Sequence, residues 1–130
     1  MSTVLVVEDS VTQREMIEDL LKGSGLTVKT AGDGVEALEQ MQGNCPDIVV
    51  MDIVMPRMNG YELCRRIKTD PKSRIKTDPK TERVPVVMCS SKGEEFDRYW
   101  GMKQGADAYI AKPFRPQELV GTVKQLLRKA

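Results

Sequence analysis

The chain has 130 residues, of which 40% are hydrophobic and 30% charged, and its formal net charge is +1. This is the composition of an ordinary soluble protein with one hydrophobic core, and the near-neutral charge gives no overall attraction to nucleic acid or to membranes. The sequence has no histidine, which excludes Ser-His and Cys-His catalysis. Its cysteines (Cys45, Cys64 and Cys89) lack metal-ligand spacing, so we expect a reduced, cytoplasmic protein without a membrane segment.

The first 25 residues predict a buried strand followed by a helix. Residues 3–9 form a continuous, valine-rich apolar run, which is typical of a strand covered on both faces. Ser10 and Gln13 have the spacing of a capping box, in which each side chain binds the other residue's backbone N–H, so a helix should begin here, and Gly23 and Gly25 should end it. The apolar residues expected on the inner face of this helix are Met16, Ile17, Leu20 and Leu21.

The same alternation of apolar runs and amphipathic segments continues to the end of the chain. Further strands are predicted at residues 26–31, 47–52, 84–90 and 106–111. Further helices are predicted at residues 34–42, 60–68 and 94–104. A last helix begins at Pro116, and its apolar face contains Leu119, Val120, Val123, Leu126 and Leu127. Five strands alternating with five helices predict an α/β fold, with a parallel sheet covered by helices on both faces.

Polar residues follow four of the five predicted strands. Glu8 and Asp9 end the first strand and Asp52 ends the third, while Ser90 and Lys112 end the fourth and fifth. In a parallel sheet these ends meet at one edge, where ligands bind, so we expect the side chains to converge. Carboxylates packed this closely would raise one another's pKa unless a cation lies between them, and Mg²⁺ suits such oxygen ligands.

The chemistry available to such a site is phosphoryl transfer. An aspartate can act as the nucleophile, while Mg²⁺ and the Lys112 ammonium neutralise charge on the transferred group. Each residue also has a purely structural interpretation: Asp9 or Ser10 could cap a helix, Asp52 could begin a loop, and Lys112 could be a surface lysine. Their coincidence at the ends of four strands favours a functional site.

Four segments together resemble the receiver domain of two-component response regulators: VVEDS, the aspartate of VVMDIVMPRMNG, VVMCSS and YIAKPF. They follow one another in the family's order and spacing over the whole chain, so we expect residues 1–130 to form a single receiver domain. The resemblance implies a doubly wound, flavodoxin-like sheet with strand order 2-1-3-4-5. It implies that Asp52 accepts a phosphoryl group from the phosphohistidine of a histidine kinase. It also implies that Asp9, Asp52 and the backbone carbonyl of Val54 ligate Mg²⁺, with Glu8 acting through water.

The same resemblance gives three residues a role in switching. Lys112 would pair with the Asp52 carboxylate and then with the phosphoryl group, Ser90 would be the hydroxyl that moves toward that group, and Tyr109 would be the aromatic that changes rotamer with it. Val54 has no side-chain group that could position a hydrolytic water. We therefore expect slow self-dephosphorylation, and no enzyme activity beyond the chain's own phosphorylation and dephosphorylation.

The resemblance also leads us to expect that output passes through a partner protein. The last predicted helix closes the fold, so the downstream partner would be a motility or signalling protein, with no nucleic acid and no membrane involved. The segment DRYWGMKQGADAYIAKPF is similar to those of stand-alone receivers in twitching-motility and phototaxis systems. Trp100 could mark the partner surface or could pack partly on the sheet. Two alternatives stay open: an adaptor that is never phosphorylated, and a phosphate sink for a shared kinase.

Residues 67–82 consist of two copies of an eight-residue segment, IKTDPKSR and IKTDPKTE, which agree at six positions. Without residues 67–74 the chain reads CRRIKTDPKTERVPVV, so we interpret the repeat as an insertion at the sheet end opposite the acidic residues. Pro71 disfavours helical geometry at Asp70, so the preceding helix should end near Thr69. We expect a monomer, although a longer connection would permit a swapped dimer or a new contact surface.

Overall fold

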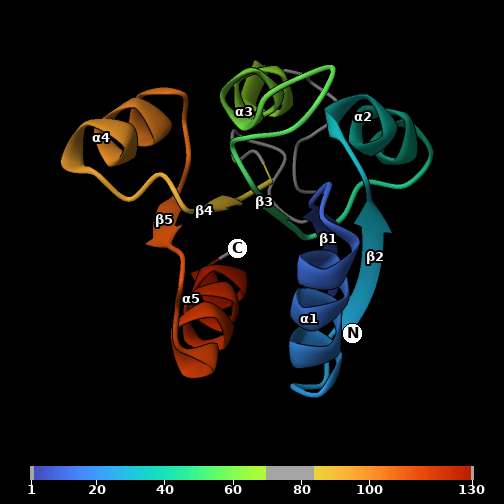
Figure 1. Cartoon of the computed structure of the whole chain (residues 1–130). Coiled ribbons are helices and arrows are strands. Elements are labelled where there is room, and N and C mark those ends of the chain that lie inside the picture. Colours follow the sequence, from blue (N-terminus) through green and yellow to red (C-terminus); the bar gives the residue numbers. More distant parts are fainter. Residues whose placement is uncertain (1, 70–83, 130) are drawn as a thin grey trace.

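A five-stranded parallel sheet forms the centre of the computed structural model, which describes residues 2–69 and 84–129 (Figure 1). The strands are β1 (Thr3–Val7), β2 (Thr27–Ala31), β3 (Ile48–Met51), β4 (Val86–Ser90) and β5 (Ala108–Ala111). The helices are α1 (Val11–Lys22), α2 (Gly34–Gly43), α3 (Gly60–Thr69), α4 (Glu95–Lys103) and α5 (Pro116–Lys129). The order across the sheet is β2-β1-β3-β4-β5 and every neighbouring pair is parallel, which confirms the predicted fold class and strand order.

Helices cover both faces of the sheet, with α1 and α5 on one face and α2, α3 and α4 on the other (Figure 1). Side chains along a strand point to alternate faces, so β1 sends Val4 and Val6 toward α1 and α5, and Leu5 and Val7 toward α2 and α3. All four are buried. Burial on both faces is the reason that β1, β3 and β4 appear in the sequence as continuous apolar runs.

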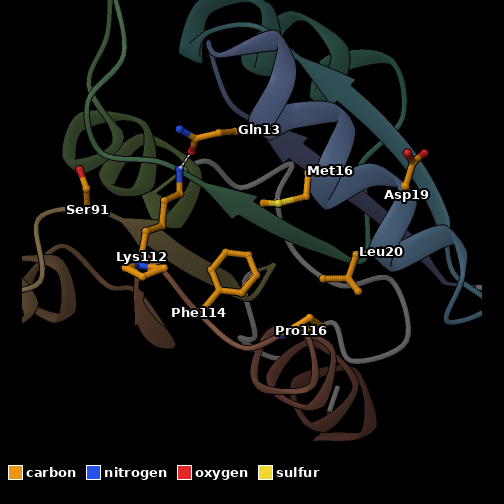
Figure 2. Close-up of a pocket in the computed structure, with 9 residues that line it drawn as sticks. Gln13, Met16, Asp19, Leu20, Ser91, Lys112, Phe114 and Pro116 are labelled. Carbon is orange, nitrogen blue, oxygen red and sulfur yellow. Dashed lines mark hydrogen bonds between the residues drawn. The ribbon is translucent and has the colours of Figure 1, made fainter.

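The apolar faces predicted for the first and last helices pack on the sheet and are buried or partly buried, with one exception. Ile17 and Leu21 of α1 and Leu119 and Val123 of α5 are buried against the sheet. The prediction was wrong for Met16, which is 49% exposed. Its side chain lies at the edge of a groove between α1 and the segment before α5, so the neighbouring helix does not cover it (Figure 2).

The start of α1 confirms half of the predicted capping box. The Ser10 hydroxyl oxygen accepts the backbone N–H of Gln13 at 3.4 Å, and Gly23 ends the helix as predicted. The reciprocal bond was predicted wrongly, because the Ser10 N–H donates instead to the Glu8 carboxylate at 3.1 Å. The Gln13 side-chain oxygen accepts a hydrogen bond from Lys112. The charged Glu8 carboxylate, two residues away, takes the Ser10 N–H in place of Gln13. The Gln13 side chain is therefore available to accept the hydrogen bond from Lys112.

The end of α3 is tied to the turn before β5. Lys68 Nζ donates to Asp107 Oδ2 at 2.7 Å, and the same oxygen accepts the N–H of Val86 at 2.8 Å. The structure describes α3 up to Thr69, and the rest of the repeat lies outside the described residues, together with the predictions on its form and on a swapped dimer. Within residues 2–69 and 84–129, no helix is long and apolar enough to cross a membrane.

Candidate functional site

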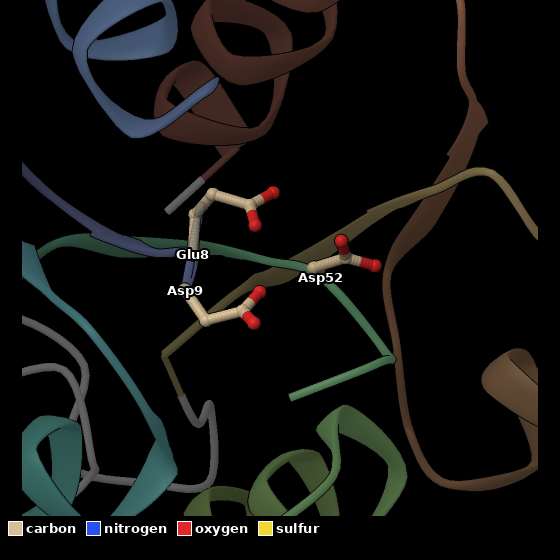
Figure 3. A group of neighbouring side chains, drawn as sticks. All are labelled: Glu8, Asp9 and Asp52. Carbon is tan, nitrogen blue, oxygen red and sulfur yellow. The ribbon is translucent and has the colours of Figure 1, made fainter. Parts of the chain in front are cut away.

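Three carboxylates meet at the carboxyl-terminal edge of the sheet, where the topology predicted a site (Figure 3). Glu8 and Asp9 follow β1, and Asp52 follows the adjacent strand β3. Each offers a carboxylate oxygen, and these oxygens lie within 4.8 Å of one another. Glu8 is 2% exposed and Asp52 is partly buried, whereas Asp9 is open to solvent. The cluster therefore extends from the interior to the surface of the edge.

Lys112, which follows β5, places its ammonium among these carboxylates. Its Nζ lies 2.6 Å from Glu8 Oε1 and 3.2 Å from Asp52 Oδ2, and it also donates to Gln13 Oε1. Burial disfavours the charged ammonium, but the hydrogen bond to Glu8 and the charges of Asp52 and Glu8 outweigh it, so the pKa of Lys112 lies above its ordinary value. The predicted pairing with Asp52 is present, but the closer contact is with Glu8.

Burial, rather than repulsion between the acids, controls the ionisation of Glu8. Loss of water around the carboxyl raises the pKa of Glu8, although hydrogen bonds from Lys112 and from the Ser10 N–H act in the opposite direction. The charge of Asp52 is the smallest of the contributions that act on Glu8. The expected mutual repulsion is weak here because the Lys112 ammonium lies between these two carboxylates.

The loop that follows β3 holds the Asp52 carboxylate in place. Asp52 Oδ1 accepts the N–H of Ile53 at 2.6 Å and that of Val54 at 3.3 Å, while Oδ2 faces Lys112. The loop closes where the Gly60 N–H donates to the Ile53 carbonyl at 2.8 Å. A Cβ on Gly60 would lie 2.2 Å from the Asp52 carbonyl oxygen, so only glycine fits at this closure.

The donor set at this edge fits a hard divalent cation. All three side chains offer carboxylate oxygens, the ligand type that Mg²⁺ prefers, and one ammonium against three carboxylates leaves an excess of negative charge. Glu8 already accepts hydrogen bonds from Lys112 and from the Ser10 N–H. Asp52 likewise accepts hydrogen bonds from Lys112 and from the N–H groups of Ile53 and Val54, so these contacts do not distinguish direct from indirect ligands, and the ligand roles of Asp9, Asp52 and Glu8 stay predictions.

Ser90 and Tyr109 lie on neighbouring strands and are joined through one residue, Lys92. Ser90 ends β4 fully buried, and its hydroxyl oxygen accepts the Lys92 N–H at 3.3 Å. The Tyr109 hydroxyl donates to the Lys92 carbonyl. The Tyr109 ring packs inward against α4, where a Cβ on Gly101 would lie 2.9 Å from it, and the Arg98 guanidinium lies 5.4 Å from its centroid. Burial raises the pKa of Tyr109 to about 12.

Several residues around the site were not recognised in the sequence. Gln13 receives a hydrogen bond from Lys112, although its position had suggested only a helix cap. Arg14 Nη1 donates to the Glu8 carbonyl at 2.9 Å. Arg57 forms an ion pair with Asp33, which lies 24 residues earlier in the chain. No sequence pattern predicts these contacts, because each joins side chains and backbone groups that come together only in the folded chain.

A groove lies beside Lys112, between α1 and the start of α5 (Figure 2). Its apolar walls come from Met16 and Leu20 on one side and from Phe114 and Pro116 on the other. Lys112, Gln13 and Ser91 line the same groove toward the acidic edge, and Asp19 lines it on α1. The groove therefore leads from an apolar surface to the ammonium that contacts Asp52.

Helix α4 carries a second apolar surface on its outer side. Trp100 is 41% exposed and packs edge-on against Phe96 and Tyr99, with ring centroids 6.1 and 6.0 Å apart. Phe96 and Tyr99 are more exposed still. We call these three rings the α4 aromatic surface; Trp100 is partly exposed and partly packed, so its role as a partner contact stays a prediction.

Comparison with known proteins gives a consistent result. The model of the response regulator receiver domain family matches residues 4–124. The DNA-binding response regulator MtrA of Mycobacterium tuberculosis (strain ATCC 25618 / H37Rv) is 37% identical over 126 residues, which make up 97% of this chain and 50% of that protein. This chain thus spans about half the length of the curated relatives that it matches.

Solved structures match over nearly the whole chain. A response regulator from Chloroflexus aurantiacus J-10-fl is 39% identical, with a TM-score of 0.87 and 98% of each chain covered. The chemotaxis response regulator CheY4 of Vibrio cholerae is 29% identical, with a TM-score of 0.84, and the match covers 97% of this chain and 98% of that one. The sheet order, the acidic edge and these matches agree, and the chain belongs to the response regulator receiver domain family.

Proposed function

We propose that this chain is a phospho-accepting response regulator in which Asp52 takes a phosphoryl group from the phosphohistidine of a histidine kinase. One observation carries the proposal: the Asp52 carboxylate, 3.2 Å from the Lys112 ammonium, belongs to a cluster of three carboxylates that can hold a divalent cation. Mg²⁺ would be held by Asp9, Asp52 and the Val54 carbonyl, with Glu8 acting through water. When bound, it would neutralise charge on the transferring group.

The transfer requires little covalent chemistry from the protein. A bond forms between a carboxylate oxygen of Asp52 and phosphorus while the P–N bond of phosphohistidine breaks, and the imidazole leaves with the electron pair. Lys112 then moves its hydrogen bond from the Asp52 carboxylate to a phosphoryl oxygen. The backbone N–H groups of Ile53 and Val54 hold the carboxylate during the attack.

Signalling would begin at Ser90. We infer that its hydroxyl donates a hydrogen bond to the new phosphoryl group and releases the Lys92 N–H. Because the Lys92 carbonyl also accepts the Tyr109 hydroxyl, a shift of Lys92 frees the ring to change rotamer against α4. The α4 aromatic surface lies on the helix that packs against this ring and is the region proposed to contact a partner.

The groove beside Lys112 is the proposed docking site for the kinase. The phosphohistidine must come within bonding distance of Asp52, and the apolar walls at Met16, Leu20 and Phe114 lead to that point. An amphipathic helix that bears the histidine would bury its apolar face there.

The output is proposed to be motility, chemotaxis or phototaxis through a downstream protein. The likeness to the chemotaxis regulator CheY4 along almost its full length supports this output. A second candidate is control of transcription, which is favoured by the relatives named as DNA-binding response regulators. The expectation that no nucleic acid is involved is weakened accordingly. In either case we propose that the chain acts on no substrate other than its own phosphoryl group, which it loses slowly.

Intact-mass measurement after incubation with a small phosphodonor and Mg²⁺ tests the proposal. We expect one added phosphoryl group, absent in Asp52→Asn and absent without Mg²⁺. Asp47→Asn is a matched control, because Asp47 lies at the other end of β3 and accepts the Thr3 N–H at 2.7 Å. An adduct in every variant would mean phosphorylation elsewhere, and no adduct in any of them would favour the unphosphorylated adaptor. Rapid drainage of phosphoryl groups from a kinase shared with a second receiver would identify a phosphate sink.

A further inference from the structure

We propose that the ion pair between Arg57 and Asp33 positions the loop between β3 and α3 and thereby sets the affinity of the acidic edge for a divalent cation. Arg57 would be a positioning residue that touches neither the cation nor the phosphoryl group. The inference rests on the proposed function, because it takes Asp9, Asp52 and the Val54 carbonyl as the residues that hold the cation.

The backbone at Arg57 shows that the loop is held in an unusual conformation. Arg57 has φ 67°, and it is the only non-glycine residue with positive φ in the described parts of the chain. This region is strained for any residue with a Cβ and is populated freely by glycine. Next to it, the Met58 N–H donates to the Pro56 carbonyl at 2.7 Å, which makes a tight turn. An arginine at such a position needs compensating contacts.

The side chain of Arg57 supplies such a contact. Its Nε and Nη2 both donate to Asp33 Oδ2, at 3.0 and 2.7 Å. The other oxygen, Oδ1, accepts the Glu36 N–H at 2.9 Å, so Asp33 is the N-cap of α2. One carboxylate thus joins the first turn of α2 to the loop after β3. The helix fixes Asp33, and Asp33 fixes Arg57.

A second contact holds the loop against the same helix. Met58 is buried, and its Cβ and Sδ lie so close to α2 that a Cβ on Gly34 would be 3.1 Å from each of them. Beyond Met58 the loop is closed by the hydrogen bond between Gly60 and Ile53. The loop is therefore fixed at the end of β3, at the start of α2 and at the start of α3.

The part of the loop between these points carries the groups that the cation needs. Val54 lies three residues before Arg57, and its N–H reaches Asp52 Oδ1, as does the N–H of Ile53. A loop that moves away from α2 would therefore shift both the Asp52 carboxylate and the Val54 carbonyl relative to Asp9, which belongs to the segment after β1. Mg²⁺ tolerates little departure from octahedral geometry, so loss of the ion pair should weaken binding.

The direction in which Mg²⁺ affinity changes when Arg57 is removed distinguishes a positioning role from a purely electrostatic one. Removing a cation from the neighbourhood of an acidic cluster strengthens Mg²⁺ binding by Coulomb's law, whereas removing a tether weakens it. We expect Arg57→Ala to weaken Mg²⁺ binding about three- to tenfold in isothermal titration calorimetry. Arg66→Ala is the matched control, because Arg66 is about as exposed as Arg57 and forms an ion pair with Glu62 at 2.9 Å within α3. We expect it to leave the affinity unchanged.

A second measurement needs no metal. In metal-free protein, the amide protons of Val54 and Gly60 should exchange with solvent faster in Arg57→Ala than in wild type, and Arg57→Lys should restore part of the protection. An Arg57→Ala protein that is folded by near-UV circular dichroism and binds Mg²⁺ as tightly as wild type, or more tightly, would overturn the inference. If wild type binds Mg²⁺ and Asp52→Asn does not, an unchanged affinity in Arg57→Ala would overturn this inference and leave the proposed function intact. If wild type binds no Mg²⁺, the proposed function fails as well.

Discussion

The two edges of the sheet both carry acidic residues but use them differently. At the amino-terminal edge, Asp107 accepts hydrogen bonds from Lys68 and from the Val86 N–H, and Asp47 accepts the Thr3 N–H. Each of these carboxylates is matched by donors and holds two segments of chain together. At the carboxyl-terminal edge three carboxylates lie together and one lysine contacts only two of them, Glu8 and Asp52, so negative charge remains in excess. Among the described residues, uncompensated negative charge thus distinguishes the edge where we propose the chemistry, whereas the carboxylates of the other edge are matched by donors that join two segments of chain.

The largest effect is expected at the loop closure of the carboxyl-terminal edge. Gly60→Ala would place a Cβ 2.2 Å from the Asp52 carbonyl oxygen and 2.8 Å from Ile53 Cα, and backbone cannot move aside as a flexible side chain can. We expect a loss of about 3 kcal/mol in the free energy of unfolding, measured with urea. Gly121→Ala is the control, because Gly121 lies in α5 with open space around it, and it should gain about 0.5–1 kcal/mol. Equal stability of the two variants would contradict the description of this loop.

The next largest effect is expected at Lys112, whose ammonium contacts both Glu8 and Asp52. Lys112→Met removes the only ammonium that contacts Glu8 and Asp52 among the described residues, so Mg²⁺ binding should tighten about tenfold. The rate of phosphorylation should nevertheless fall about a hundredfold, since the transferring group loses its charged donor. Calorimetry and intact mass give the two quantities, and Lys22→Met, which removes the ion pair with Glu18 on α1, should change neither. A decrease in both affinity and rate would show that Lys112 acts mainly as a structural support.

A smaller loss of stability is expected at the amino-terminal edge. Asp107→Ala removes the acceptor for Lys68 and for the Val86 N–H, and this should lower the free energy of unfolding by about 1–2 kcal/mol. Glu62→Ala removes only an exposed pair with Arg66 and should cost about 0.5 kcal/mol or less. Phosphorylation should be unchanged in both variants. If Asp107→Ala abolished phosphorylation while remaining folded, the division of roles between the two edges would be wrong.

Tyr109 is expected to have the smallest effect, because its ionisation changes the free energy of unfolding only at high pH. Its folded-state pKa is about 12, against an ordinary value of 10.0, so the folded state disfavours the phenolate. The folded state should therefore lose stability relative to the unfolded state as the pH rises from about 10 to 12, with no effect below that range. Urea unfolding across this range should show a steeper loss in wild type than in Tyr109→Phe. Identical pH dependence in the two proteins would mean that Tyr109 is more open to solvent than the structure shows.

The sequence predicted the fold well because both faces of the sheet are covered. The resulting apolar runs mark β1, β3 and β4, whereas the edge strand β2 has exposed residues at alternate positions. Glu8 and Asp52, which were assigned to strands, lie just beyond β1 and β3. The residues of the acidic edge could be predicted as a group, since the topology alone brings the ends of β1, β3, β4 and β5 together. Met16 could not be placed correctly, because its exposure depends on how closely α5 approaches α1.

The contacts around the site could not be predicted from local pattern. Gln13 and Lys112 are 99 residues apart, and Arg57 and Asp33 are 24 apart. Whether such side chains meet depends on loop conformation, including the positive φ of Arg57, for which the sequence has no glycine as a signal. The roles of the site residues, as distinct from their positions, remain predictions that phosphorylation experiments must test.

The most direct test of the central claim compares three proteins in one assay. Wild type, Asp52→Asn and a variant without residues 67–74 would be incubated with a small phosphodonor and Mg²⁺, and their masses measured over time. We predict equal incorporation of one phosphoryl group in wild type and in the shortened chain, and none in Asp52→Asn, because the proposed chemistry belongs to the carboxyl-terminal edge alone. A phosphoryl group on Asp52→Asn, or its loss from a folded protein that lacks one copy of the repeat, would contradict that claim.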